Sequence, residues 1–159
     1  MSCERLLPDV LPAGDLVQST HHLHLDPLPR LVWEARHFVL EHAPDLPEET
    51  QDALVLLTSE LVTNAILHAR TPIELGITVA EDSVLVTVHD LDLARREQTP
   101  YAPREGGWGL GLVQSLAEEA EMTPDPEGGK TAWFRLSRSH VRDVPDGAAA
   151  RASTAGGPR

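Results

Sequence analysis

Apolar residues recur every three or four positions in two stretches of the first half of the chain. This spacing is typical of helices that bury one face. The first helix is predicted to begin after Pro29 and to end before Pro44. The second is predicted to begin near Asp45, as the cap, with Pro47 in its first turn, and to run to about Ala69. Its apolar face comprises Leu54, Leu57, Leu61 and Ala65.

Strict alternation of apolar and polar residues follows in residues 73–79 and again in residues 84–89. Two such runs joined by the short polar segment Glu81-Asp82-Ser83 predict an antiparallel hairpin. A short strand is expected at His21 to Asp26, and a last strand at Thr131 to Leu136.

The remainder of the central region is predicted to hold a loop, a helix and a turn. Leu91 to Gly107 has no periodicity, and a long loop of this kind inside a domain is usually functional. A third helix is expected from Leu110 to Glu121, followed by a turn from Pro124 to Gly129. The order helix, helix, strand, strand, helix, strand predicts an α+β fold. It would be a two-layer sandwich with the helices on one face of a mostly antiparallel sheet.

The length of 159 residues fits one domain with irregular ends. We assign residues 1–20 to an irregular N-terminal extension, 21–142 to the folded domain, and 143–159, rich in Ala, Gly and Pro, to a disordered tail. No apolar run approaches the roughly 20 residues that span a bilayer. The N-terminus lacks the basic start and apolar stretch of a signal peptide, so a cytoplasmic location without membrane contact is expected.

Charge narrows the range of partners. The formal net charge is −12 at pH 7. A surface this acidic repels phosphate backbones, which disfavours direct binding of nucleic acid. It suits a protein partner with a basic face, although most of the scattered carboxylates serve solubility.

Three polar residues follow one stripe of the second predicted helix. Glu60, Asn64 and His68 are spaced at i, i+4 and i+8, directly beside the apolar row. A polar stripe at the edge of a buried face is compatible with the wall of a cleft. Taken alone, it is more typical of a solvated helix face.

A glycine-rich segment, Gly106 to Gly111, precedes the third predicted helix. Glycines let a backbone approach a ligand closely, and the amides that open a helix suit phosphate. The segment is not a Walker A motif, because it lacks the Lys-Ser/Thr pair. A flexible hinge would have the same composition.

Two further features stand at strand ends. Asp90 closes the second strand of the hairpin, where its carboxylate could accept a hydrogen bond from an adenine amino group. Gly128-Gly129-Lys130-Thr131 opens the last strand, and Lys130 is the single lysine of the chain. An ordinary strand-end aspartate and a tight turn are the simpler explanations for each.

Together, in this order, the four features resemble the GHKL (histidine-kinase-like) ATPase superfamily, and in particular its anti-sigma-factor serine/threonine kinase branch. Glu60-Leu-Val-Thr-Asn64-Ala-Ile-Leu-His68 resembles the N box, and Val88-His-Asp90 the start of the first glycine box. Gly107-Trp-Gly109-Leu-Gly111 resembles the second glycine box, and Gly128-Gly-Lys-Thr131 the closing strand. The resemblance covers about Pro29 to Leu136.

The resemblance implies ATP and Mg²⁺ as cofactors. It implies that Asn64 coordinates Mg²⁺, that Asp90 recognises adenine with Thr131 nearby, and that Glu60 is the general base for a partner's hydroxyl. Leu91 to Gly107 would be the ATP lid, and Arg104 or Lys130 could neutralise charge. The phosphates would be held by the backbone amides of Gly107, Gly109, Leu110 and Gly111.

The implied function is an anti-sigma factor that phosphorylates a serine or threonine of a small antagonist protein. Its partners would be a sigma factor and that antagonist, with a homodimer as a further possibility. One departure favours an alternative, a non-catalytic binding module. The first glycine box reads Asp90-Leu-Asp92-Leu-Ala94, so two glycines typical of the family are replaced. The catalytic domain of a two-component kinase fits less well, because no dimerising helical hairpin precedes the core.

Overall fold

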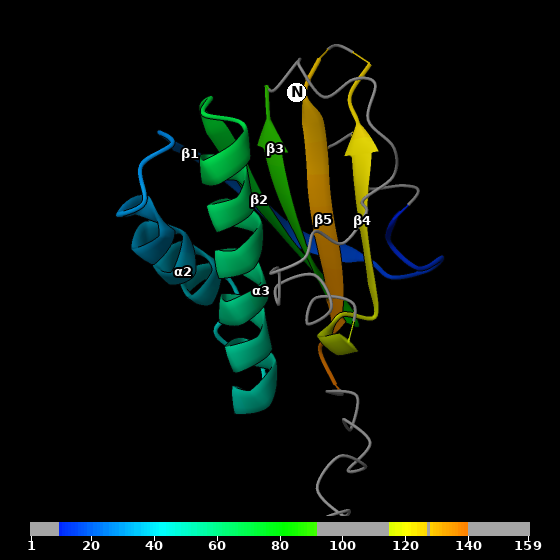
Figure 1. Ribbon diagram of the computed structural model, residues 1–159. Helices are drawn as coiled ribbons and strands as arrows, with labels where there is room; N and C mark the ends of the chain where they lie inside the picture. The colour runs from blue at the N-terminus through cyan, green and yellow to red at the C-terminus, as the bar shows by residue number, and fades with distance from the viewer. Residues whose placement is uncertain (1–9, 92–114, 127, 140–159) are drawn as a thin grey trace, which may run out of the picture.

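The structure is a computed structural model, and it describes residues 10–91, 115–126 and 128–139. Within these residues the chain forms one five-stranded sheet with two helices on one of its faces (Figure 1). In chain order the elements are β1 (Val17–Leu25), α2 (Leu31–His42), α3 (Glu48–His68), β2 (Ile73–Ala80), β3 (Ser83–Asp90), β4 (Glu119–Pro124) and β5 (Lys130–Ser137).

The strand order is β1-β2-β3-β5-β4, and every neighbouring pair is antiparallel. The predicted α+β fold, with helices on one face of an antiparallel sheet, is therefore confirmed. The hairpin predicted from the two alternating runs is β2 and β3, joined at Glu81 and Asp82. The two helices predicted in the first half of the chain correspond to α2 and α3.

The main core lies between the helices and the sheet. All four residues that were predicted to form the apolar face of the second helix are buried there. They meet the helix-facing side chains of the central strands, among them Val86, Val88 and Phe134, none of which is more than 1% exposed. Because α3 contacts β2, β3 and β5, its position is fixed over the centre of the sheet.

The N-terminal region differs from the expected irregular extension. β1 is nine residues long and begins at Val17, four residues before the short strand that was predicted. Val10 is also buried, in a small cluster with Leu85 and Trp133 on the face of the sheet opposite the helices. These two side chains point away from the helices, so the segment before β1 supplies their cover.

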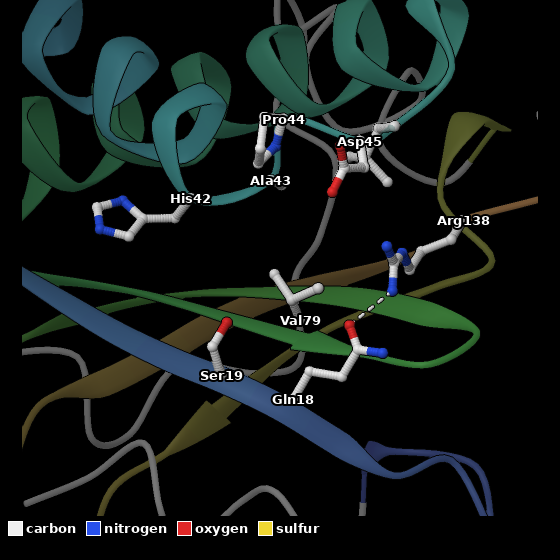
Figure 2. A pocket seen from close by; sticks show the side chains of 9 residues that line it. Gln18, Ser19, His42, Ala43, Pro44, Asp45, Val79 and Arg138 are labelled. Carbon is white, nitrogen blue, oxygen red and sulfur yellow. Dashed lines mark hydrogen bonds between the residues drawn. The ribbon is translucent and has the colours of Figure 1, made fainter.

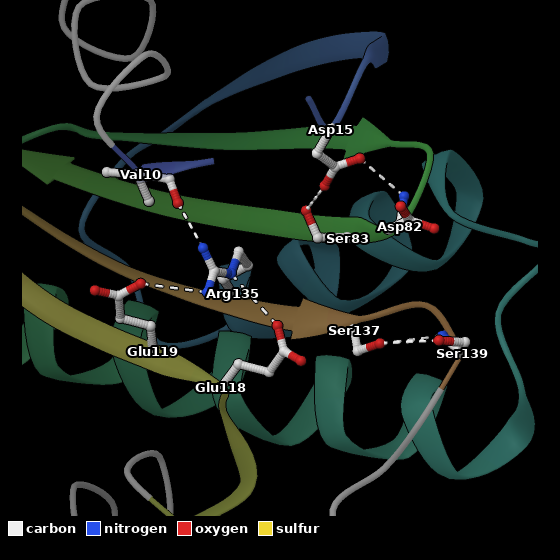
Figure 3. Close-up of polar contacts among 9 residues, drawn as sticks. All are labelled: Val10, Asp15, Asp82, Ser83, Glu118, Glu119, Arg135, Ser137 and Ser139. Atoms are coloured by element: carbon white, nitrogen blue, oxygen red, sulfur yellow. Dashed lines mark hydrogen bonds and ion pairs between the residues drawn. The ribbon is translucent and has the colours of Figure 1, made fainter. Parts of the chain in front are cut away.

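Polar contacts hold that segment in place (Figure 3). Arg135 donates from Nη1 to the carbonyl oxygen of Val10 at 2.8 Å. The Asp15 carboxylate accepts from the backbone amide of Asp82 at 2.9 Å and from the hydroxyl of Ser83. The segment is thereby attached both to β5 and to the turn between β2 and β3.

The predicted end of the third helix is wrong. Helix ends at Leu116, and Glu119–Pro124 is strand β4, paired with β5. Ala, Glu and Met are good helix formers, but cross-strand pairing overrides local propensity. Arg135 adds to this pairing through contacts of 3.4 Å with Glu118 and 3.3 Å with Glu119. The part of this helix before residue 115 lies outside the described residues.

The predicted cap of the second helix is also wrong. The residue that precedes the first turn of α3 is Pro47, and no side chain caps it. Gln51 instead donates from its side chain to the carbonyl oxygen of Leu46 at 2.8 Å, which holds the loop before the helix. Glu48 and Glu49 place negative charge at the helix N-terminus, where it is favourable.

Candidate functional site

The described candidate residues gather mainly at one end of the sheet. Strand register aligns Ile73, Asp90 and Lys130 across β2, β3 and β5, with Pro124 of β4 next to them. α3 ends at His68, five residues before β2 begins, so the C-terminus of this helix lies at the same end (Figure 1). The end of β3, the start of β5 and the last turn of α3 therefore surround one region.

Asp90 and Lys130 form the central contact of this region. The ammonium of Lys130 lies 2.9 Å from Oδ2 and 3.2 Å from Oδ1 of Asp90. The side chain of Asp90 is 3% exposed and that of Lys130 is 12% exposed. A carboxylate with so little exposure to solvent requires a partner, and the ammonium of Lys130 supplies one. The resemblance implied recognition of adenine by Asp90 but gave no definite role to Lys130.

Gly129 brings the start of β5 against the end of β3. Its φ is +84°, and a Cβ placed on it would lie 1.8 Å from the carbonyl oxygen of Asp90. Only glycine fits such an approach without moving the backbone. The turn before it is closed by Asp125, whose amide donates to the carbonyl of Gly129 at 3.0 Å. Gly129 thus allows the start of β5 to lie against the backbone of Asp90.

Thr131 lies beside this region but its side chain is on the opposite face of the sheet. It is paired in register with His89, and its hydroxyl is 3.1 Å from Nδ1 of that histidine. The carboxylate of Asp125 also lies near His89, with its Oδ2 atom 4.0 Å from Nδ1. The structure therefore places Lys130, and not Thr131, against the side chain of Asp90.

Thr71 holds the point at which the chain leaves β3. Its hydroxyl accepts a hydrogen bond of 3.1 Å from the backbone amide of Leu91, directly after Asp90. Thr71 belongs to the short connection between α3 and β2. The first residue of the predicted lid is therefore hydrogen-bonded to the connection that follows α3, a contact for which the sequence offered no signal.

The polar stripe of α3 is present on that helix. Glu60 and Asn64 are half-buried, and His68, in the last turn, is exposed. Asn64 lies about one turn and Glu60 about two turns before His68, so the stripe extends from the Asp90 end toward the middle of the sheet. A half-buried carboxylate and a half-buried amide beside a buried apolar row suit the wall of a cleft better than a fully solvated face.

The glycine-rich residues cannot be placed. Gly107, Gly109, Leu110 and Gly111 lie outside the described residues, as do Arg104 and all of the predicted lid except Leu91. Their roles stay predictions.

A pocket of about 170 Å³ lies at the other end of the sheet (Figure 2). Val79, near the end of β2, faces it, and the loop between α2 and α3 borders it. Arg138 reaches into its rim and donates to Gln18 at 2.9 Å and to the carbonyl of Ala80 at 2.8 Å. None of the predicted site residues lines this pocket, so it is separate from the Asp90 region.

The residues at the Asp90 end fit a nucleotide with Mg²⁺. Among the described residues no group of three or more His, Cys, Asp and Glu side chains is placed to hold a metal ion. Mg²⁺ in nucleotide sites needs no such group, because phosphates and water supply most of its ligands. A single amide such as that of Asn64 would be sufficient from the protein, while Asp90 offers a buried acceptor for a base.

Comparison with known families agrees with this geometry. The model of a family described as histidine kinase-like ATPase domain matches residues 25–136, from the last residue of β1 to near the end of β5. No curated protein matches the chain. Neither described helix has the length and apolar character required to cross a membrane.

Proposed function

Because the chain belongs to the histidine kinase-like ATPase family, we propose that it is an ATP-binding regulator that acts as an anti-sigma-factor serine/threonine kinase. Domains of this family bind ATP, generally with Mg²⁺, and membership supports an ATP-dependent kinase or ATPase activity. The protein substrate, the sigma factor and the residue roles below belong to the proposal.

The observation that carries the proposal is the stripe of α3 beside the Asp90 end of the sheet. Asp90 would bind the base, and Asn64 would bind Mg²⁺ between the phosphates through its side-chain oxygen. Glu60, half-buried on the same stripe, would accept the proton of a serine or threonine hydroxyl. Bound ATP supplies the phosphoryl group, and the transfer depends mostly on positioning and on neutralised charge.

The proposed partners are a sigma factor and a small antagonist protein. The net charge of −12 suits a partner with a basic face and disfavours DNA. Binding of the sigma factor would hold it inactive, and phosphorylation of the antagonist would control how much of the regulator is available. A homodimer belongs to the same proposal.

A non-catalytic binding module is the second candidate. Asp92 and Ala94 replace two glycines of the typical first glycine box. Side chains at positions where glycine normally allows close approach would weaken nucleotide binding, and the protein would then regulate by contact alone.

Glu60→Gln tests the kinase. Gln keeps the size and hydrogen bonding of Glu but cannot accept the proton, so transfer to the antagonist should fall by about 10²- to 10⁴-fold while ATP binding stays intact. Asn64→Ala should instead weaken both ATP-Mg²⁺ binding and transfer. Candidate partners are the sigma factors and antagonist-like proteins encoded beside this gene.

The matched control is Glu49→Gln, the same change at an exposed position in the first turn of α3. It should leave transfer unchanged. Wild-type transfer by Glu60→Gln would refute the general base. If the wild-type protein binds a sigma factor but transfers nothing, the non-catalytic module is correct.

A further inference from the structure

Two side chains of opposite charge line the pocket at the end of the sheet away from Asp90. Arg138 directly follows β5, and Asp45 belongs to the loop between α2 and α3. Figure 2 shows this loop on one side of the pocket and Arg138, beside Gln18 of β1, on the other. In the described part of the chain neither Arg138 nor Asp45 forms an ion pair, so the two charges share one pocket without neutralising each other.

The guanidinium of Arg138 is held in one position by neutral acceptors. Its Nη1 donates to Oε1 of Gln18 at 2.9 Å, and to the carbonyl oxygens of Ala80 at 2.8 Å and Glu81 at 3.4 Å. None of these hydrogen bonds uses Nε or Nη2, the pair of donors that matches the two oxygens of a carboxylate. Arg138 is therefore oriented by the protein while its charge and its carboxylate-binding edge are not used by these contacts.

The size of the pocket limits what it can hold. Its volume is about 170 Å³, and a cavity of roughly 150 Å³ is large enough for benzene. The pocket therefore has room for a molecule of about six to nine non-hydrogen atoms. Ser19 adds a hydroxyl to the lining, and Val79 adds apolar surface. A small molecule that carries both a carboxylate and an ammonium fits this lining, because each charge finds its opposite.

We propose that the pocket binds a free amino acid with a small side chain, its carboxylate on Nε and Nη2 of Arg138 and its ammonium at the carboxylate of Asp45. A free amino acid carries both charges on one carbon, whereas a peptide separates them at its two ends. The loop that lines the pocket leads directly into α3, so the ligand would contact the segment before the helix that carries Glu60 and Asn64.

The experiment titrates the isotope-labelled full chain with glycine, alanine and serine and follows the backbone amides by NMR. Two analogues of alanine are added separately: propionate, which lacks the ammonium, and ethylamine, which lacks the carboxylate. A hydrogen bond to a charged group typically contributes roughly 10- to 100-fold in affinity. Alanine should therefore bind at least about tenfold more tightly than either analogue. The amides of Ser19, Leu46 and Val79 should shift, and that of Asp90 should not.

Two variants assign the charges. In Asp45→Asn the preference for alanine over propionate should fall to within about twofold, and in Arg138→Met the preference for alanine over ethylamine should fall likewise. Asp45 is exposed, so its replacement leaves the fold intact even if Arg138→Met loosens the turn between β2 and β3. The matched controls are Asp52→Asn and Arg30→Met, at exposed positions that do not line the pocket, and both should keep the wild-type preferences.

Three results would overturn the inference. They are the absence of shifts at the pocket with any of the three amino acids up to about 20 mM, equal binding of alanine and propionate by the wild-type protein, and an unchanged preference in Asp45→Asn. The proposed nucleotide function is tested separately, because its residues lie at the other end of the sheet. Failure of the protein to bind ATP would leave this inference standing.

Discussion

Replacing Gly129 by alanine should be far more damaging than the same replacement at Gly14. Both glycines have a positive φ, +84° and +92°, so alanine at either position incurs a conformational cost of about 1–2 kcal/mol. The surroundings differ. The added Cβ at Gly14 meets nothing within 4 Å, whereas at Gly129 it lies 1.8 Å from the carbonyl oxygen of Asp90.

The clash at Gly129 is with backbone, which has little freedom to move. Ordinary contact begins near 3.4 Å, so the oxygen and the new carbon must separate by about 1.6 Å, the difference between those two distances. Asp90 is held between Ile73 and Lys130 in the sheet, so this displacement would disturb the pairing. Overpacking of this kind typically costs a further 1–3 kcal/mol or so.

Urea unfolding should therefore show a loss of about 2–5 kcal/mol for Gly129→Ala and of about 1–2 kcal/mol for Gly14→Ala. Against a typical stability of about 5–15 kcal/mol, the first loss is a large fraction. ATP titration should also show weaker binding for Gly129→Ala only, because Asp90 would be displaced. If the two variants lose equal stability, within about 0.5 kcal/mol, the close approach of β5 to β3 described above is wrong.

Three further measurements test the site and the packing. Asp90→Asn should weaken ATP binding at least about tenfold by calorimetry, whereas Asp125→Asn, at the same end of the sheet, should leave it unchanged. Unchanged affinity in Asp90→Asn would exclude recognition of the base by this carboxylate. Leu57→Ala should lower the free energy of unfolding in urea by roughly 2–5 kcal/mol because Leu57 is fully buried. Leu56→Ala, at a position 39% exposed, should lower it by under about 0.5 kcal/mol, and equal losses would contradict the orientation of α3. Arg135→Met should cost roughly 1–3 kcal/mol by loss of the contact with Val10, and an unchanged unfolding midpoint would show that this contact adds nothing.

The sequence predicted the elements whose patterns are long and self-consistent. The helical face of α3 and the two alternating runs of β2 and β3 carry enough repeats to define both type and orientation. β4 (Glu119–Pro124) was missed because its first four residues are individually good helix formers, and because the strand depends on pairing with β5. β1 was underestimated for a related reason, since Val17 to Thr20 show no alternation of their own and form strand by pairing with β2.

The candidate site was predictable in part. Asp90 could be placed at the end of a strand from the alternation alone, and the stripe of Glu60 and Asn64 from helical spacing. Which residue of the last strand faces Asp90 could not be predicted, because that depends on register with a partner strand. The register turns the side chain of Lys130 toward Asp90, and the role that the resemblance implied for Thr131 stays a prediction.

The alternation of β5 has a consequence for how the protein tolerates changes in length. The side chains of β5 that face the helices are those of Lys130, Ala132, Phe134 and Leu136. The side chains between them lie on the opposite face of the sheet. Loops generally accept an inserted residue at little cost. An extra residue in the turn between β4 and β5 that shifted β5 by one position would exchange its two faces, removing the lysine from the carboxylate and the phenylalanine from the core together. The number of residues in that turn is therefore as much a determinant of the site as the identity of any side chain in it.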